Sequence, residues 1–360
     1  MCPATWQSRR TVMRSRGGAI GRACAARRKA RPRSWLSYAA TCRAGDPRAA
    51  LRARALPSAL VRALVLSNML PDTAHPERGR FVRDQVDALR RLGDPSVELY
   101  EFSPGARALA HAARDLRKRY AGERFEVVHA HFGLTAWPAL AVKAGARALT
   151  VHGTDVRHPR TRLATRAVLP TVGLLGAVSE ALVQELPGRR ARERAQVLPC
   201  GVDLERFEAM PRARAQSILN LDSQHPYLLF PADPSRPEKR FDRARALAEA
   251  VGAQLLTLGG VHPERVPLYV NAAHAVIVPS EREGFGLAVL EALACEVPVL
   301  ATPVGVHPQA LDGLAGTLCA PFELERWRAA LAPVVAERDP RVAGRAHAEG
   351  FSSSRMAERL

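Results

Sequence analysis

Short apolar runs alternate with amphipathic segments through most of the chain after residue 60. The segments between the runs repeat apolar residues every three or four positions, as helices packed on a core do. The first series of runs predicts strands at 63–68, 97–102, 125–131, 148–153, 173–178 and 196–199. Helices are predicted between them at 81–92, 108–120 and 179–186. Apolar strands separated by helices are typical of a doubly wound parallel sheet.

A second series of apolar runs follows a polar segment bounded by Pro211 and Pro226. This series predicts strands at 227–230, 253–259, 275–278, 298–301 and 315–319. A chain of 360 residues is long enough for two domains. We therefore expect an α/β protein with two Rossmann-like domains, whose parallel strands end at a shared cleft. The predicted parts are a first domain at 59–210, a linker at 211–226, a second domain at 227–342 and a closing helix with a serine cap at 343–360.

The positive charge of the chain is concentrated in its first 60 residues. They hold 14 of the 53 Lys and Arg residues and a single acid, Asp46, so 39 basic and 34 acidic residues remain for the rest. Residues 1–58 show no sustained period and no apolar core of signal-peptide length. We expect them to be an extension without regular structure, or a stretch absent from the mature protein. An arm that binds nucleic acid is the less favoured interpretation.

Cysteine spacing and missing motifs exclude several classes of protein. The six cysteines form no CxxC pair, so neither a disulfide framework nor a zinc site is predicted, and a reducing cytoplasm fits best. No apolar run approaches the ~20 residues that span a bilayer, which leaves peripheral contact with the inner face of a membrane. The chain also lacks a GxGxxG after a strand, a Walker loop and a DxD triplet. We expect a site that uses neither a metal ion nor a cofactor.

The segment 278–301 contains the strongest candidates for a ligand-binding site. Its turn contains Gly284 and Gly286, and a helix is predicted to begin near Leu287. A helix start offers free N–H groups and the positive end of a dipole, which favour a phosphate. Glu291 lies one turn further on, where a carboxylate can accept hydrogen bonds from the vicinal hydroxyls of a ribose. Glu283 precedes the helix and would face the group beyond the phosphates. Ribose, diphosphate and sugar in this order describe a nucleotide-sugar.

The same residues resemble the donor-site signature of family 4 glycosyltransferases. That signature places two glutamates, with seven residues between them, in an EGFG-L-LEA context, and the flanks at 266–280 and 295–311 are similar as well. The resemblance implies a GT-B fold and retaining transfer of a hexosyl group from a UDP- or GDP-sugar. It implies that the donor is bound by Glu283, Gly284, Phe285, Gly286, Leu287 and Glu291.

If no metal neutralises the diphosphate, cationic side chains must do so. The segment 231–244 follows a predicted strand and supplies Arg236, Lys239 and Arg240. In the family a lysine and an arginine contact the diphosphate here, and Lys239 matches that lysine. Asp233 stands at the usual place of the arginine, so Arg236 is the expected substitute. Arg240 stands where the family often has glycine, and we expect it to face solvent.

The first domain offers further candidates. His152 ends a predicted strand in an HGTD context, and the resemblance implies that it lies near the transferred sugar and takes part in catalysis. Asp155 is expected either to position His152 or to contact acceptor hydroxyls. His129 and His131 either line the acceptor side or are packed strand-end residues. Gly79 matches in part a glycine loop whose amides meet the donor phosphates.

Two more segments resemble the family but differ from it at individual residues. Residues 198–207 are similar to its NGVD-F segment near the interdomain hinge, with Cys200 replacing asparagine and Gly201 read as a turn requirement. Gln309 stands where a glutamate is common, which puts an acceptor or capping role in doubt.

The sequence leaves the acceptor and the competing functions open. A saccharide or lipid-linked acceptor of the cell envelope fits the resemblance. The basic helices at 81–92 and 106–120 are expected to rest on anionic lipid or to form a solvated face. A glycoside hydrolase also uses two carboxylates, but those flank one bond, and these face a helix start. A GT-B epimerase or phosphorylase, and a nucleic-acid-binding protein acting through residues 1–58, are the remaining alternatives.

Overall fold

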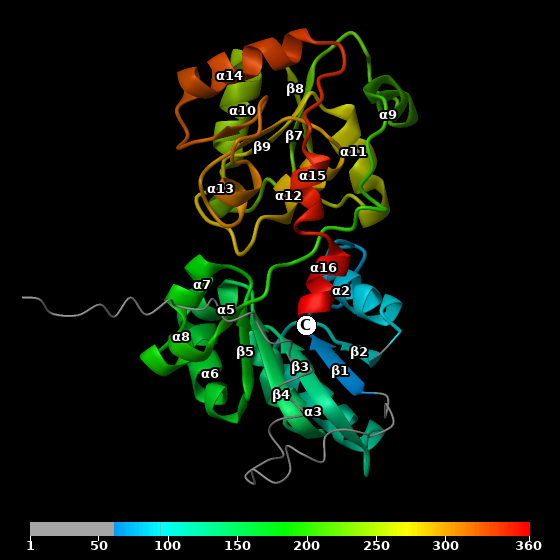
Figure 1. The fold of residues 1–360 in the computed structure, drawn as a ribbon, viewed down its shortest axis with the longest axis vertical. Coiled ribbons are helices and arrows are strands. Elements are labelled where there is room, and N and C mark those ends of the chain that lie inside the picture. The colour runs from blue at the N-terminus through cyan, green and yellow to red at the C-terminus, as the bar shows by residue number, and fades with distance from the viewer. Residues whose placement is uncertain (1–60, 94) are drawn as a thin grey trace, which may run out of the picture. The chain divides into compact units, whose positions relative to one another are not determined.

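The structure, a computed structural model, describes residues 61–93 and 95–360. The predictions for residues 1–58 therefore concern residues outside the described part of the chain and remain predictions. The described residues form two parallel sheets, each flanked by helices (Figure 1). This is the two-sheet architecture that the alternating pattern predicts. Among the described residues, no helix is both long enough and apolar enough to cross a membrane.

The first sheet has six parallel strands in the order β2-β1-β3-β4-β5-β6. The strands run in register from the start of the described chain, with Ala63 opposite both Val97 and Val127. Their bounds are β1 Arg62–Ser67, β2 Ser96–Glu101, β3 Arg124–His131, β4 Lys143–Val151, β5 Leu174–Ala177 and β6 Gln196–Val197. The helices of this domain are α2 Arg80–Arg91, α3 Ala106–Arg119, α4 Ala136–Ala139, α5 Thr154–Arg157, α6 Pro159–Val168, α7 Glu180–Glu185 and α8 Arg189–Arg194, with short 3₁₀ turns η1 Gly133–Thr135 and η2 Leu169–Thr171.

The second sheet has five parallel strands in the order β11-β10-β9-β7-β8. Their bounds are β7 Tyr227–Phe230, β8 Gln254–Thr257, β9 Ala275–Val278, β10 Val299–Ala301 and β11 Leu318–Cys319. The remaining helices are α9 Arg212–Ile218, α10 Phe241–Ala250, α11 Val266–Ala272, α12 Leu287–Ala294, α13 His307–Ala310, α14 Leu324–Ala336, α15 Arg345–Glu349 and α16 Ser353–Arg359, with 3₁₀ turns η3 Pro237–Lys239 and η4 Pro263–Arg265. Every strand predicted from the sequence has a counterpart, and most predicted bounds differ from the observed ones by one or two residues.

Alternating side chains supply a separate core on each face of a sheet, because successive residues of a strand point in opposite directions. In β1, Leu64 and Leu66 belong to the core beneath α3, whereas Val65 belongs to the core that includes residues of α2 and α16. In the second sheet, Leu228 and Phe230 pack with Trp327 of α14, and Leu229 joins the opposite face. Each sheet is thus covered on both faces, as parallel sheets require.

The closing helix α16 returns to the first domain. Ser352 caps it by accepting a hydrogen bond from the amide of Arg355. Met356 and Leu360 share a core with Val65 and Val82, and α16 lies beside α2 in Figure 1. Gly201 is required for this contact and not for a turn with positive φ, because a Cβ there would lie 2.4 Å from the Cα of Ser353.

The segment 211–226, expected as a linker, contains helix α9. Arg212 and Gln216 on this helix are buried, and Gln216 donates to the carbonyl of Ala272 at the end of α11. The helix therefore packs on the second domain rather than hanging between the two. Its short, polar sequence, RARAQSI, gave no apolar period from which a helix would be predicted.

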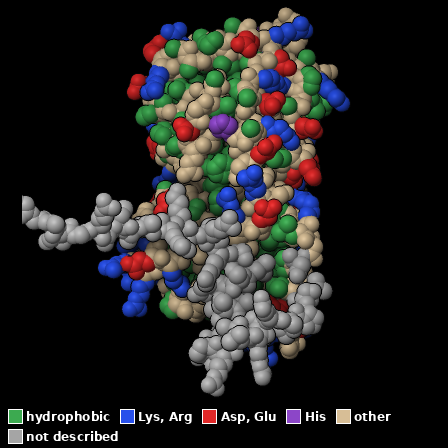
Figure 2. Space-filling model, in the orientation of Figure 1, with side chains coloured by type: hydrophobic (Ala, Val, Ile, Leu, Met, Phe, Trp, Pro, Cys, Tyr) green, Lys and Arg blue, Asp and Glu red, His purple; other side chains and the backbone are tan. Residues whose placement is uncertain are grey.

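Charges of both signs are mixed on the described surface. On the face that Figure 2 shows, Lys and Arg side chains lie among Asp and Glu side chains rather than in one patch. This agrees with the small net charge calculated for the chain after residue 60.

Candidate active site

Two cavities lie where the strands of both sheets end. The first, which we call the α12 cavity, has a volume of about 440 Å³ and is lined by Leu287 and Glu291 of α12, by Arg236 and Lys239, and by residues of α2. The second, the Glu283 cavity, has a volume of about 470 Å³ and is lined by His152, Arg157, Glu283 and Arg282. Arg236 and Lys239 line both, so the two cavities share one cationic wall.

Glu283 and Lys239 form a close ion pair at this wall. The Lys239 Nζ atom lies 2.6 Å from Glu283 Oε2, and the Ser280 hydroxyl donates to Glu283 Oε1 at 2.8 Å. Burial alone would raise the pKa of Glu283, but the charge and hydrogen bond of Lys239 outweigh it, so the pKa is lowered. Glu283 is therefore ionised, and the structure brings together two residues that the sequence analysis expects at the donor site.

Glu291 lines the α12 cavity. No hydrogen bond joins its side chain to any residue that the structure describes. Its pKa is raised to about 7: burial is the main cause and the charge of Asp84 adds to it, while the cations of Arg206 and Arg80 act in the opposite direction. A partly buried carboxylate with free acceptor capacity is suited to accept hydrogen bonds from a pair of hydroxyls.

The two glycines of the turn are needed for packing against the protein itself. A Cβ on Gly284 would lie 2.2 Å from the carbonyl oxygen of His152, and a Cβ on Gly286 would lie 2.5 Å from Nε2 of His307. Gly286 is the N-cap of α12 and has a φ of 106°, at which a side chain would strain the backbone. The expected reason for these glycines is close approach of a ligand. Their contacts with His152 and His307 are a second physical reason why no side chain is tolerated there. Leu287 begins α12 as predicted.

Phe285 does not line either cavity. Its side chain is buried, and its ring lies 6.3 Å from that of Phe351. It anchors the turn in the core, so any contact with a donor would come from its backbone.

The basic loop before α10 places its three cations differently. Arg236 is exposed and pairs with Glu238, 2.7 Å away, yet it lines both cavities. Arg240 pairs with Asp242 and Glu281 at the surface and lines neither of the two, as expected. Its φ of 58° is left-handed, which explains why a glycine is common here in the family.

Three histidines lie together near the ends of β3 and β4. Nε2 of His152 lies 3.0 Å from Nδ1 of His131, and Nε2 of His129 lies 2.8 Å from the hydroxyl of Thr150. Burial lowers the pKa of His129 to about 4 and that of His152 to about 3, and it lowers the pKa of His131 as well. All three are neutral near pH 7. His152 can therefore donate or accept a hydrogen bond, but it does not carry a stored proton for catalysis.

Asp155 holds the backbone of the His152 turn. Its carboxylate accepts hydrogen bonds from the amides of His152, at 3.1 Å, and of Gly153, at 2.8 Å. Burial raises its pKa to about 6 despite these bonds. Of the two roles expected for Asp155, the structure favours positioning of His152.

Gly79 is the N-cap of α2 and lines neither cavity. It has a φ of 71°, and a Cβ there would lie 2.4 Å from the carbonyl oxygen of Met69. The next residue, Arg80, lines the α12 cavity in its place.

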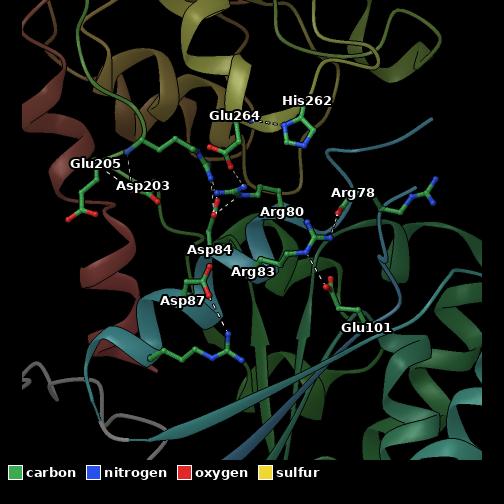
Figure 3. Close-up of polar contacts among 12 residues, drawn as sticks. Arg78, Arg80, Arg83, Asp84, Asp87, Glu101, Asp203, Glu205, His262 and Glu264 are labelled. Atoms are coloured by element: carbon green, nitrogen blue, oxygen red, sulfur yellow. Dashed lines mark hydrogen bonds and ion pairs between the residues drawn. The ribbon is translucent and has the colours of Figure 1, made fainter. Parts of the chain in front are cut away.

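A network of charged residues that the sequence did not reveal lies on the first-domain side of the α12 cavity (Figure 3). Asp84 of α2 accepts from Arg80 at 2.8 Å and from both Nη atoms of Arg206 at 2.9 Å. Arg80 also reaches Glu264 of η4, with 2.5 Å between Nη1 and Oε1. The network joins α2, the hinge segment and the second domain. The only feature of the sequence that indicates this network is Asp84, an acid between the apolar positions Val82 and Val86.

These features define a glycosyltransferase of the GT-B fold, with a site between two Rossmann-like domains. The chain belongs to glycosyltransferase family 4: residues 51–206 match the family described as Glycosyltransferase Family 4, and residues 208–349 match Glycosyl transferases group 1. Members of this family use nucleotide-sugar donors, so a transferase, rather than a glycoside hydrolase, is the class to which the chain belongs.

Curated relatives and solved structures agree with this assignment. The chain is 30% identical over 308 residues to a D-inositol 3-phosphate glycosyltransferase of Actinosynnema mirum, a match that covers 67% of this chain and 72% of the relative. A protein of the same name from Segniliparus rotundus is 29% identical, over 66% of this chain and 65% of its own.

The fold resembles two solved structures in particular. Sucrose-phosphate synthase from Thermosynechococcus elongatus superposes with a TM-score of 0.64 at 18% identity, covering 82% of this chain and 96% of its own. HepE from Anabaena, solved in complex with UDP and glucose, superposes with a TM-score of 0.59 at 15% identity, covering 82% and 97%. At these identities the likeness shows the fold alone.

Proposed function

We propose that the protein transfers a hexosyl group from a UDP- or GDP-sugar to an acceptor hydroxyl, with retention of the anomeric configuration. The observation that carries the proposal is the cationic wall shared by two cavities. Lys239 and Arg236 lie between Glu291, on one side, and the ionised Glu283 with His152, on the other. The α12 cavity would hold the nucleoside, with Glu291 at the ribose, and the diphosphate would cross the wall toward Glu283.

The chain's own residues would stabilise the charge that develops during transfer. The bond between the anomeric carbon and the β-phosphate oxygen breaks, and its electron pair stays on the phosphate. The acceptor oxygen bonds to the anomeric carbon, and its proton passes to the departing phosphate. Lys239, Arg236 and the amides at the start of α12 would stabilise the leaving group, and Glu283 would hold sugar hydroxyls. The neutral His152 would fix the sugar by a hydrogen bond.

We expect cations of the chain to neutralise the diphosphate without a metal ion. Within residues 61–93 and 95–360, no three His, Cys, Asp or Glu side chains are grouped so that they could hold a metal. Turnover that is unchanged after dialysis against a chelator would support this part of the proposal, and loss of turnover that Mg²⁺ or Mn²⁺ restores would contradict it.

The acceptor would enter the Glu283 cavity. Arg282 lines it and forms no ion pair with another described residue, and His158 lies beside it. An acceptor with an anionic group fits these residues. We propose a saccharide or a lipid-linked saccharide of the cell envelope. A polyol phosphate is a second candidate, since the relatives act, by their names, on D-inositol 3-phosphate.

Peripheral contact with an anionic membrane, at the inner face of the membrane in the cytoplasm, remains part of the proposal. In α2, Arg80 and Arg83 are bonded to Asp84 and Glu101 within the protein, so the contact would fall mainly on α3. Salt-sensitive flotation with acidic liposomes tests it, and flotation that neutral liposomes match would contradict it.

The decisive test compares three variants of the cationic loop and of α12. Lys239→Ala should lower turnover by about 100-fold or more, the size of effect found when a single transition-state contact is removed. Glu291→Ala should lower turnover at subsaturating donor by about tenfold or more, because the ribose loses a charged acceptor. Arg240→Gly is the matched control, because it removes a neighbouring cation at a left-handed position and should leave turnover unchanged. Wild-type turnover in the first two variants would refute the proposal.

The same assay separates the alternatives of similar fold. A transferase releases free nucleoside diphosphate only when an acceptor is present, whereas an epimerase interconverts the donor without release. A thermal-shift screen of UDP- and GDP-sugars would supply the donor for these assays.

A further inference from the structure

Two successive carbonyl groups in front of α12 accept hydrogen bonds from the first domain. Nη1 of Arg157 donates to the backbone oxygen of Glu283 at 3.1 Å. The hydroxyl of Ser179 donates to the backbone oxygen of Gly284 at 3.0 Å. Both bonds cross from one Rossmann-like domain to the other and end on the turn that carries Glu283.

Helix α7 fixes both donors. Glu185, at its end, binds Arg157 through two bonds, Nε to Oε2 at 2.7 Å and Nη2 to Oε1 at 2.8 Å. Ser179 is its N-cap, is buried, and accepts a hydrogen bond from the amide of Leu182. A guanidinium held on two sides and a capping hydroxyl have little freedom to turn. The two carbonyls therefore meet donors that are already in place.

The orientation of these carbonyls sets the direction of two amide groups. In a trans peptide the C=O and N–H bonds point in opposite directions. The N–H groups of Gly284 and Phe285 must then point away from α7. Neither group, nor the amide of Gly286, makes a hydrogen bond with another described residue. They lead directly into the free amides at the start of α12, and successive free amides of this kind form a concave site for an anion.

We propose that Arg157 and Ser179 are positioning residues, which turn the 283–284 and 284–285 peptide groups so that their N–H groups face the leaving diphosphate. This inference rests on the proposed function. It assigns to the first domain a part in the stabilisation of a group that the second domain binds. Negative charge grows on the diphosphate as the glycosidic bond breaks, so misdirected amides weaken the transition state more than the bound donor.

The contact also couples domain closure to catalysis. Gly284 allows it, because a Cβ would collide with the carbonyl of His152. The amides acquire their final direction only when Arg157 and Ser179 reach the turn, which requires the two domains to be together. Donor bound to an open protein would then be protected from hydrolysis, since the cradle for its leaving group is incomplete.

The experiment uses the full chain and three changes at Ser179. Ser179→Thr keeps both the cap and the donated bond, and should retain wild-type turnover. Ser179→Asp keeps an acceptor for the cap but cannot donate to Gly284, and Ser179→Ala loses both. The proposal predicts that kcat falls about tenfold or more in the last two variants. Because Ser179→Asp retains the cap, its loss of turnover separates orientation from simple destabilisation of α7.

Arg157→Lys gives an independent measurement. It keeps the positive charge but loses the planar fork that joins Glu185 to the Glu283 carbonyl, so it should also lower kcat about tenfold. Arg160→Lys, on the exposed start of α6, is the control and should behave as wild type.

Nucleotide affinity then shows which group is affected. UMP and UDP, and GMP and GDP, are titrated into each variant by calorimetry. The diphosphate should bind about tenfold more weakly to Ser179→Asp and Arg157→Lys than to wild type, while the monophosphate of the same base, which lacks the β-phosphate, binds as before. Wild-type kcat in both variants, or equal weakening of mono- and diphosphate, would overturn the inference. A wild-type protein that binds none of the four nucleotides would instead overturn the proposed function on which it rests.

Discussion

The carboxylate of Glu291 lies in the α12 cavity without a hydrogen-bond partner among the described residues, and burial raises its pKa to about 7. The ionised form accepts two hydroxyl hydrogens, whereas the protonated form donates one of its own, so ribose binding favours ionisation. Without a bound donor, the stability of the fold has the opposite pH dependence. A carboxyl whose pKa is raised on folding stabilises the fold below its unfolded value of about 4.5, and this stabilisation is lost as the pH rises through 7.

We predict that donor affinity increases as the pH is raised from about 6 to about 8, with a midpoint near the pKa of Glu291. The measurement is the KM for the donor, or the Kd of its nucleoside diphosphate, across this range. Glu291→Gln should bind the donor about tenfold more weakly at pH 8, because an amide accepts less strongly than a carboxylate. The variant should also lose the pH dependence. A slope that persists in Glu291→Gln would assign it to another group.

The sequence identified the residues that share one loop or helix, and missed those brought together by the fold. Glu283, Lys239, Glu291 and His152 were predicted from local motifs, and the structure places all four along two adjoining cavities. Arg206 and Arg157 were not predicted. Each forms hydrogen bonds with a residue more than 25 positions away in the sequence, so no local motif indicates its role.

The strands of the second domain show which elements can be predicted from the sequence. Runs such as YLLF at β7 and AVIV at β9 are apolar on both faces, and the observed bounds equal the predicted ones. Helix α9 could not be predicted in the same way, because its buried residues include Arg212 and Gln216. Nη2 of Arg212 and Nε2 of Gln216 donate to backbone carbonyls of other elements, contacts that only the folded chain reveals.

The turn before α12 depends on the absence of a side chain at residue 284. We predict that Gly284→Ala abolishes detectable turnover, because its Cβ would stand 2.2 Å from the carbonyl oxygen of His152 and push the Glu283 turn away from the first domain. The φ of Gly284 lies outside the left-handed region, so backbone strain does not contribute. The measurement is kcat, with the melting temperature as a check on folding.

Gly173→Ala is the matched control for this substitution. Its φ also lies outside the left-handed region, and the nearest atom to its Cβ, the carbonyl oxygen of Arg147, is 3.7 Å away. This variant should retain wild-type turnover. If Gly284→Ala does so as well, the turn has room to shift, and close approach to the first domain is not required for activity.

At the scale of the whole molecule, most of the net charge lies outside the two domains. Of the formal +18, residues 1–60 contribute +13, which is the basis of the nucleic-acid alternative. We predict that a chain lacking residues 1–57 keeps its glycosyltransferase activity, since every residue that lines the two cavities lies after position 74. Comparison of kcat and KM between the full and shortened chains tests this. Loss of activity, together with nucleic-acid binding by the full chain alone, would favour the alternative.

The ion network of Figure 3 connects domain packing to the chemistry of the donor site. Asp84 is buried, with only 8% of its side chain exposed, and it binds Arg206, which is 11% exposed. Removal of one partner from a buried ion pair leaves the other charge uncompensated, at a cost of about 3–5 kcal/mol. We therefore predict that Asp84→Ala lowers the free energy of unfolding by about 3 kcal/mol, as measured by urea denaturation. Asp87→Ala, on the exposed side of the same helix, should change it by less than about 0.5 kcal/mol.

The same pair of variants tests whether this network sets the pH response of the donor site. The charge of Asp84 raises the pKa of Glu291, whereas that of Arg206 lowers it. Loss of Asp84 removes the first effect and leaves Arg206 without its carboxylate, so both changes favour ionisation of Glu291. The midpoint of the donor-affinity curve should therefore move below 7 in Asp84→Ala and stay in place in Asp87→Ala. A midpoint that is the same in both variants would show that α2 supports the domain interface without reaching the carboxylate that binds the donor.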